Sequence, residues 1–254
     1  MTLISVCVLL VIRSFFVRNL AAHSLGCYNI NMKTNSKRGL VTKTKILDAA
    51  ASRILKFGVN GTSVDEILSD SGTGKSQFYH YFGSKDLMIL ELVEHLSHSL
   101  PMYAPEVLEE IRTKKDFSDW LQSFAKAFKT GRLKYGCPLG NIACEMSASN
   151  EPIRLSVLAI FDTWIDLLAK TLLRLHKSGD LALNQPSNQA AESIFQAIQG
   201  SLLLANTRGS SQCLEDLNSY INRYLSSESP KKIGASAIRP MQPTSIRRNV
   251  GFCP

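Results

Sequence analysis

The 254-residue sequence predicts an all-α protein with two helical domains. Apolar residues recur every three or four positions in several windows, which is the period of an amphipathic helix. Breaks that contain Gly, Pro or Ser separate these windows. No window alternates apolar and polar residues between turn signals, as a half-buried strand does. These three observations together define the fold class.

The charge of the chain is unevenly distributed. The formal net charge is +8, and 20% of the residues are charged, a fraction that excludes a wholly disordered chain. Residues 33–63 carry seven Lys or Arg against Asp48 alone, whereas residues 98–228 are close to neutral. A basic segment beside a neutral one favours a nucleic-acid partner more specifically than the summed charge does.

Both ends are predicted to lie outside the fold. The apolar run at residues 3–12 is too short to span a bilayer, and no basic residue precedes it as in a secretion signal. Met32 begins a stretch typical of a cytosolic N-terminus, so residues 1–31 are interpreted as an upstream segment outside the translated protein. A disordered extension and a membrane signal are the alternatives. Residues 229–254 predict a disordered basic tail.

No pattern indicates catalysis, a cofactor or a metal. The six cysteines form no C-x-x-C pair, so free thiols in a reducing cytosol are expected. Cys137 and Cys144 are two helical turns apart and could react with oxidants or electrophiles as a sensor. Packing in the core as small apolar side chains explains both cysteines as well. The triplet at residues 74–76 imitates the end of a phosphate-binding loop, but an amphipathic helix precedes it instead of a strand.

The first predicted helix covers residues 42–57. Gly58 ends it, and Asn60-Gly61 forms a turn. Ser63, three residues before Glu66, predicts a capping box that starts a short second helix. The apolar face of the first helix consists of Ile46, Ala49, Ala50, Ile54 and Phe57.

A break at residues 71–74 separates the second helix from a third, predicted over residues 75–82. Two short helices joined by a tight glycine-containing turn form a helix-turn-helix. A fourth helix is expected from Ser84 to His98. The outward positions of the third helix are Lys75, Ser76, Gln77, Tyr79 and His80. Their polar side chains suit a major groove, although solvent exposure alone also explains them.

The order of residues over 58–93, GVNGTSVDEILSDSGTGKSQFYHYFGSKDLMILELV, resembles the DNA-binding segment of TetR/AcrR-family transcription regulators. Two departures are Gly74, where the family usually has Ser as the cap of the recognition helix, and Ser71 in place of the usual Ala. The resemblance is carried by Gly58, Gly61, Thr62, Ser63, Ile67, Gly72, Phe78–Phe82 and Ser84–Leu87.

The resemblance implies a set of DNA-binding residues. The third helix becomes the recognition helix, which faces base edges and nearby phosphates, while the tyrosine hydroxyl reaches the DNA backbone. Residues at helix N-termini donate to phosphates. The expected members are Lys43, Thr62, Ser63, Lys75, Ser76, Gln77, Tyr79, His80 and Lys85.

A second helical domain is predicted over residues 99–228. An apolar stripe runs from Phe117 to Phe128, and Pro138 starts the next helix. A long helix follows Pro152 and ends at Gly179. Two further helices are expected over residues 190–206 and 212–225.

The last two helices resemble the dimer-forming helices of the same family. The first of them is rich in small residues, which permit close helix approach, although the core of a monomer explains this too. A homodimer places two recognition helices about one DNA turn apart. The expected interface residues are Ala197, Gly200, Ser201, Ala205, Leu217 and Tyr220.

Aromatic residues from several helices are candidates for lining an effector cavity, although ordinary core packing explains each one individually. They are Phe124, Phe128, Phe161, Trp164 and Phe195. The stretch Gly136–Glu145, with Trp164 and Gln199-Gly200 downstream, resembles a subgroup of multidrug-resistance repressors.

The sequence therefore predicts a cytoplasmic, non-enzymatic regulator that binds double-stranded DNA as a homodimer. We expect a repressor that a small-molecule effector releases from a palindromic operator by shifting the fourth helix. No cofactor, metal or membrane partner is expected. The alternatives are an activator of the same fold and a helical ligand-binding protein without operator binding.

Overall fold

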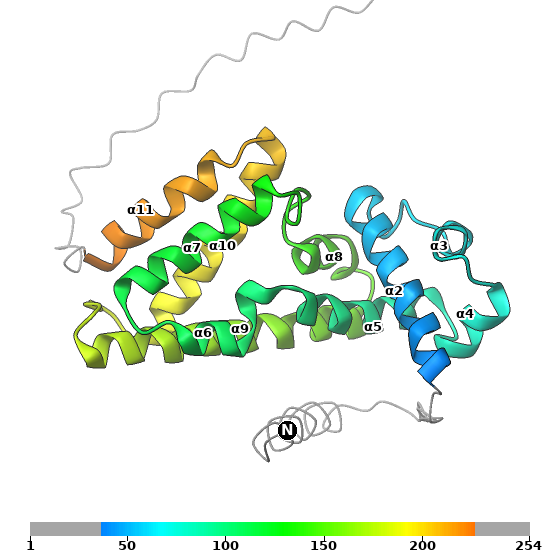
Figure 1. Ribbon diagram of the computed structural model, residues 1–254, viewed down its shortest axis with the longest axis horizontal. Coiled ribbons are helices and arrows are strands. Elements are labelled where there is room, and N and C mark those ends of the chain that lie inside the picture. The colour runs from blue at the N-terminus through cyan, green and yellow to red at the C-terminus, as the bar shows by residue number, and fades with distance from the viewer. Residues whose placement is uncertain (1–36, 227–254) are drawn as a thin grey trace, which may run out of the picture. The chain divides into compact units, whose positions relative to one another are not determined.

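The computed structural model describes residues 37–226, and every regular element in this range is helical (Figure 1). The all-α prediction is therefore confirmed. The expectations for residues 1–31 and 229–254 lie outside the described range. The order is α2 (Lys37–Phe57), α3 (Val64–Ser71), α4 (Lys75–Tyr81), α5 (Lys85–Ser99), the 3-10 helix η1 (Pro101–Tyr103), α6 (Pro105–Glu110), α7 (Lys114–Lys129), α8 (Pro138–Met146), α9 (Glu151–Ser178), α10 (Ser187–Arg208) and α11 (Gln212–Ser226).

Local hydrogen bonds explain why the short helices begin and end where they do. The hydroxyl of Ser63 accepts from the backbone N–H of Glu66, and the Glu66 carboxylate accepts from the backbone N–H of Ser63 at 2.8 Å. This is the expected capping box of α3. Gly72 ends α3 in the left-handed conformation, at φ 63°. Its missing Cβ makes that conformation accessible at little cost.

A continuous apolar core joins α2 to α5. The buried residues of the first three helices and their turns are Ile46, Leu47, Ala50, Ile54, Val59, Ile67, Leu68, Phe78 and Phe82. The prediction for Phe57 is wrong, because its ring is half exposed at the end of α2. Val59, in the following turn, is buried instead. The ammonium of Lys56 lies 4.9 Å from the centre of the exposed Phe57 ring.

The C-terminal helices pack in pairs. The long helix α9 runs beside α10, α10 pairs with α11, and α11 contacts α7 (Figure 1). Buried polar side chains secure the irregular segment between α5 and α7. The indole N–H of Trp120 donates to the carbonyl of Met102 at 2.7 Å, and Thr171 Oγ1 donates to the carbonyl of Leu108 at 3.1 Å. The short helix α6 in this segment was not predicted from the sequence.

No helix within residues 37–226 is sufficiently long and apolar to cross a membrane. The three cysteines of this range, Cys137, Cys144 and Cys213, are free thiols.

Candidate nucleic-acid interface

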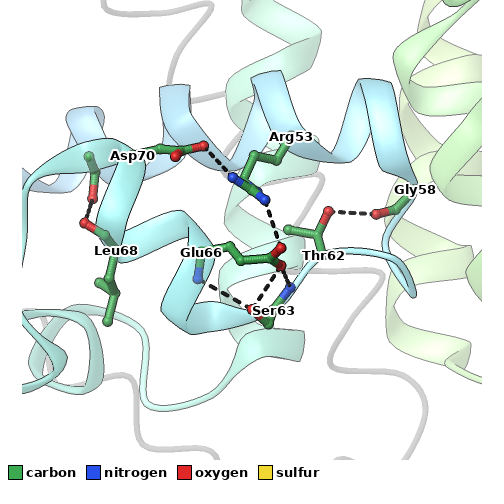
Figure 2. Close-up of polar contacts among 8 residues, drawn as sticks. Arg53, Gly58, Thr62, Ser63, Glu66, Leu68 and Asp70 are labelled. Atoms are coloured by element: carbon green, nitrogen blue, oxygen red, sulfur yellow. Dashed lines mark hydrogen bonds and ion pairs between the residues drawn. The ribbon is translucent and has the colours of Figure 1, made fainter.

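Arg53 of α2 links the first two helices of the helix-turn-helix unit. Its guanidinium donates to Asp70 at 2.8 Å and to Glu66 at 2.7 Å, and Figure 2 shows it between the two carboxylates. Glu66 also accepts from the Ser63 hydroxyl at 2.8 Å. The network cross-links α2 to both ends of α3. Arg53 was not identified from the sequence. A signal was present, because Glu66 and Asp70 lie one helical turn apart on α3 and this helix contains no basic residue to pair with them.

The network changes the acidity of its members. The backbone N–H and hydroxyl of Ser63, together with Arg53, hold the pKa of Glu66 below its ordinary value. The same pairing with Asp70 raises the pKa of Arg53. Glu66 therefore stays ionised, and keeps its hydrogen bonds, to a lower pH than an unperturbed glutamate would.

The depressed pKa of Glu66 predicts a pH dependence of stability. Its contribution is complete above its unfolded pKa and is lost as pH falls through the lower folded pKa. In Glu66→Gln we expect a lower melting temperature at pH 7 and a smaller further decrease between about pH 5 and pH 3 than in the parent. Calorimetry across this range measures both effects. Glu106→Gln is the control, because Glu106 is an exposed carboxylate on α6. A melting temperature that falls as steeply with decreasing pH in Glu66→Gln as in the parent would contradict the assignment.

The recognition helix α4 turns its predicted DNA-contacting side chains outward. Phe78 is completely buried, whereas Tyr79 is 55% exposed. The other outward side chains are those of Lys75, Ser76, Gln77 and His80. Solvent therefore reaches all five of the side chains expected to contact DNA from this helix.

Two of these side chains also have partners within the protein. The ammonium of Lys75 lies 2.9 Å from Asp65, which raises the pKa of Lys75. Gln77 Oε1 accepts from the backbone N–H of Gly74 at 3.1 Å. Gly74 has no side chain to cap α4, so Gln77 supplies a cap from inside the helix. Only the amide Nε2 of Gln77 then serves as a donor to a base.

The expectation for Thr62 needs correction. Its side chain is buried, and its hydroxyl donates to the carbonyl of Gly58 at 2.8 Å, closing the turn before α3. A phosphate contact from this hydroxyl would require the turn to open. Ser63 remains exposed, although its hydroxyl already donates to Glu66.

The two lysines outside α4 also have partners. Lys43 pairs with Glu91 of α5, and its ammonium lies 5.6 Å from the centre of the Phe82 ring. The ammonium of Lys85 donates to the carbonyl of Val59 at 2.6 Å. Since a lysine ammonium carries three donors, one bond to a carbonyl leaves capacity for a phosphate.

Most of the predicted effector residues gather in one aromatic cluster. Tyr103 of η1, which the sequence did not single out, stacks on Trp164 with ring centres 4.0 Å apart. Tyr103 also contacts Phe124 and Phe195 edge to face, and Phe161 lies against Phe195. The cluster is packed as core. Phe128 is not part of it, since it lines an open surface groove with Gly131 and Gly209.

A polar group lies at the edge of this cluster. Gln199 Nε2 donates to the Tyr103 hydroxyl at 3.4 Å, and burial raises the pKa of that phenol. The neighbouring Cys137 is buried, and burial likewise raises the pKa of its thiol. A thiol kept protonated reacts poorly with oxidants, so the burial favours the apolar role for Cys137.

The expected dimer residues divide between surface and core. Tyr220 is 53% exposed and Gly200 is exposed, whereas Ala197 and Ser201 are partly buried. Ala205 of α10 and Leu217 of α11 were placed wrongly, because both are buried within the chain. The sequence pattern missed Leu203 and Leu204 of α10, which are exposed.

Comparisons with known proteins decide the family. Residues 46–92 match the sequence model of bacterial regulatory proteins of the tetR family, and residues 114–220 match that of the LmrA/YxaF-like C-terminal domain of transcriptional regulators. An uncharacterized HTH-type transcriptional regulator in the lacX 3' region of Lactococcus lactis subsp. lactis is 36% identical over 168 residues, which are 64% of this chain and 82% of that protein. The chain belongs to the TetR family of transcriptional regulators.

Two further similarities agree with this membership. The HTH-type transcriptional repressor DhaR of Mycobacterium sp. (strain GP1) is 22% identical over 158 residues, covering 62% of this chain and 79% of DhaR. The crystal structure of a TetR-family regulator from Agrobacterium tumefaciens superposes with a TM-score of 0.67 at 20% identity, covering 74% of this chain and all of that one. The fold of this TetR-family regulator is thereby confirmed.

The family assigns roles to the two parts of this TetR-family regulator. Its N-terminal match, over residues 46–92, contains both helices of the helix-turn-helix, so the protein is a DNA-binding transcriptional regulator and belongs to a family without enzymatic activity. The C-terminal match confirms the subgroup resemblance of the stretch Gly136–Glu145.

Proposed function

We propose that this TetR-family regulator is a cytoplasmic, ligand-responsive repressor that binds a palindromic operator as a homodimer. The observation that carries the proposal is α4, whose buried Phe78 anchors a helix with five outward side chains able to contact DNA. Its similarity to the repressor DhaR supports repression over activation. Residues 32–98 bind DNA in this proposal, and residues 99–228 bind the effector and the second subunit.

The exposed apolar side chains of α10 and α11 support the homodimer. Leu203 is 65% exposed, and Leu204 and Tyr220 are also exposed. Exposed large apolar side chains on two helices that contact each other favour an interaction surface there. Two subunits joined here would present two recognition helices to successive major grooves.

The aromatic cluster around Tyr103 and Trp164 supports a small apolar or aromatic effector. Apolar and aromatic walls with few polar groups are typical of ligand sites in proteins. Gln199 and the Tyr103 hydroxyl supply the polar groups that would orient such a ligand. Because the cluster is close-packed, a ligand there must displace its rings, which gives the ligand a means to change the conformation.

Selection of DNA from a pool of random duplexes tests the proposal. We expect enriched duplexes with two inverted half-sites about ten base pairs apart, because a two-fold dimer reads a palindrome. A single asymmetric site would contradict the dimeric complex, and no enrichment would favour a helical ligand-binding protein. A transcription assay with the selected site upstream of a reporter separates repression from activation.

Leu203→Glu is expected to weaken the dimer at least tenfold, about 1.4 kcal/mol, because it places a charge in an apolar contact. Analytical ultracentrifugation over a concentration series measures the dissociation constant. Leu173→Glu, at an exposed leucine of α9, is the matched control and should leave the dimer intact. Equal dimer affinity in Leu203→Glu and the parent would remove α10 from the interface.

A further inference from the structure

Glu145, near the end of α8, binds the turn between α2 and α3. Its Oε1 accepts from the backbone N–H of Val59 and its Oε2 from that of Asn60, both at 3.0 Å. Two successive backbone N–H groups form a concave donor pair that suits an anion. Hydrogen bonds to a carboxylate are stronger than neutral ones. A carboxylate of the C-terminal domain thus binds the helix-turn-helix domain.

Gly58 makes room for this carboxylate. A Cβ at position 58 would lie 2.7 Å from Glu145 Oε1, closer than such contacts occur. Gly58 also has φ 78°, a conformation that disfavours other residues. The glycine therefore ends α2 and leaves the space that Glu145 occupies.

The first residue of α5 also binds this turn. The carbonyl of Val59 accepts from Lys85, while the Val59 side chain is buried in the core. The turn leads through the buried Thr62 directly to Ser63, the cap of α3. A displacement of the turn would therefore be passed to α3, the helix that α4 contacts.

The opposite end of α8 lies at the aromatic cluster. Cys137 caps α8 and accepts from the backbone N–H of Gly140 at 3.4 Å. A Cβ on Gly140 would lie 3.4 Å from Gln199 Oε1, and Gln199 donates to Tyr103 of the cluster. The nine residues of α8 span about 13 Å at the helical rise. A single helix thus joins the cluster to the turn.

We propose that Glu145 is a positioning residue for DNA binding, through which α8 sets the position of the α2–α3 turn. Displacement of α8 by a ligand at the aromatic cluster withdraws the carboxylate and frees the turn. This deepens the proposed ligand-responsive repressor and rests on it. It adds a second connection between the domains beside the fourth helix, α5.

Amide hydrogen exchange tests the contact without any DNA. In Glu145→Gln we expect the Val59 and Asn60 amides to exchange about tenfold faster, because the side-chain amide has one acceptor oxygen in place of two. The Glu66 amide, inside the capping box, should keep its rate. Glu151→Gln is the matched control, since Glu151 pairs with Arg154 on α9. Parental exchange rates at Val59 and Asn60 in Glu145→Gln would overturn the proposal.

Binding to a duplex selected by the parent protein tests the positioning role. Glu145→Gln should raise the dissociation constant for this duplex at least fivefold, with an unchanged melting temperature. Glu151→Gln should bind the duplex as the parent does. Faster exchange with parental DNA affinity would reduce Glu145 to a local structural contact and overturn the proposal. Failure of the parent to select any duplex is a different result, because it would refute the proposed function while exchange still reports the contact.

Gly140→Val tests transmission along α8, because a Cβ at this position already lies 3.3 Å from the Cβ of Cys137 and 3.4 Å from Gln199 Oε1, so the two methyl groups of valine must push on these neighbours. We expect faster exchange at Val59 and Asn60 in Gly140→Val, with no further increase when Glu145→Gln is added. Gly140→Ala, with a smaller side chain, is the second variant if Gly140→Val does not fold. Unchanged exchange at the turn in a folded Gly140 variant would overturn the role of α8.

Discussion

Phe78→Ala is expected to lower the free energy of unfolding by about 3–5 kcal/mol, the range for removing a buried aromatic side chain. Phe78 is completely buried and packs against Phe82, with ring centres 5.3 Å apart. The cavity would lie directly beneath α4, so operator binding should be lost together with stability. Urea denaturation and titration of the selected duplex measure the two effects.

Tyr79→Ala provides the matched comparison one residue further along α4. Because Tyr79 is 55% exposed, its removal should change the unfolding free energy by less than about 1 kcal/mol. Its loss should still weaken binding to every duplex, since its hydroxyl is expected to contact the DNA backbone. Similar destabilisation by the two variants would mean that α4 does not present the face described above.

Gln77→Ala is expected to relax discrimination between operator sequences by about 0.5–1.5 kcal/mol, the value of one hydrogen bond, because only the Nε2 amide of Gln77 is left to contact a base. Lys85→Ala should instead weaken binding to all duplexes alike and reduce the salt dependence. Competition between the selected duplex and single-base variants of it measures both effects. Discrimination in Gln77→Ala equal to that of the parent would remove Gln77 from the readout.

Gln77→Glu separates base readout from helix capping. A carboxylate keeps the acceptor for the backbone N–H of Gly74 but loses the amide donor. If Gln77 contacts a base, Gln77→Ala and Gln77→Glu should both change the preferred DNA sequence. If only Gln77→Ala has an effect, the cap of α4 is responsible.

Much of the helix-turn-helix was predictable because its determinants are local. Ser63 and Glu66 are three residues apart, and Gly72 needs only its own backbone freedom to end α3. The outward side chains of α4 also follow from helical spacing around Phe78. The same local logic failed at Phe57, where the helix period pointed to the core, although Phe57 is half exposed and Val59 in the following turn is buried.

Contacts between distant segments could not be predicted in this way. Arg53 lies 13 residues from Glu66, and Glu145 lies 86 residues from Val59. Tyr103 joined the aromatic cluster only because η1 folds against Trp164. Ala205 and Leu217 are residue types that suit a dimer interface, but whether they are buried within the chain depends on how its helices pack.

The sequence by itself determined the helical class, the limits of most helices and the family resemblance, because caps, glycines and apolar spacing act within a few residues. Only the tertiary structure decided which polar groups are already bound. Thr62 closes a turn, Lys85 binds a carbonyl, and Glu145 binds the Val59 and Asn60 amides that Gly58 leaves accessible. A carboxylate and two backbone amides far apart in sequence carry no mutual pattern, since only the packing of α8 brings them within hydrogen-bond distance.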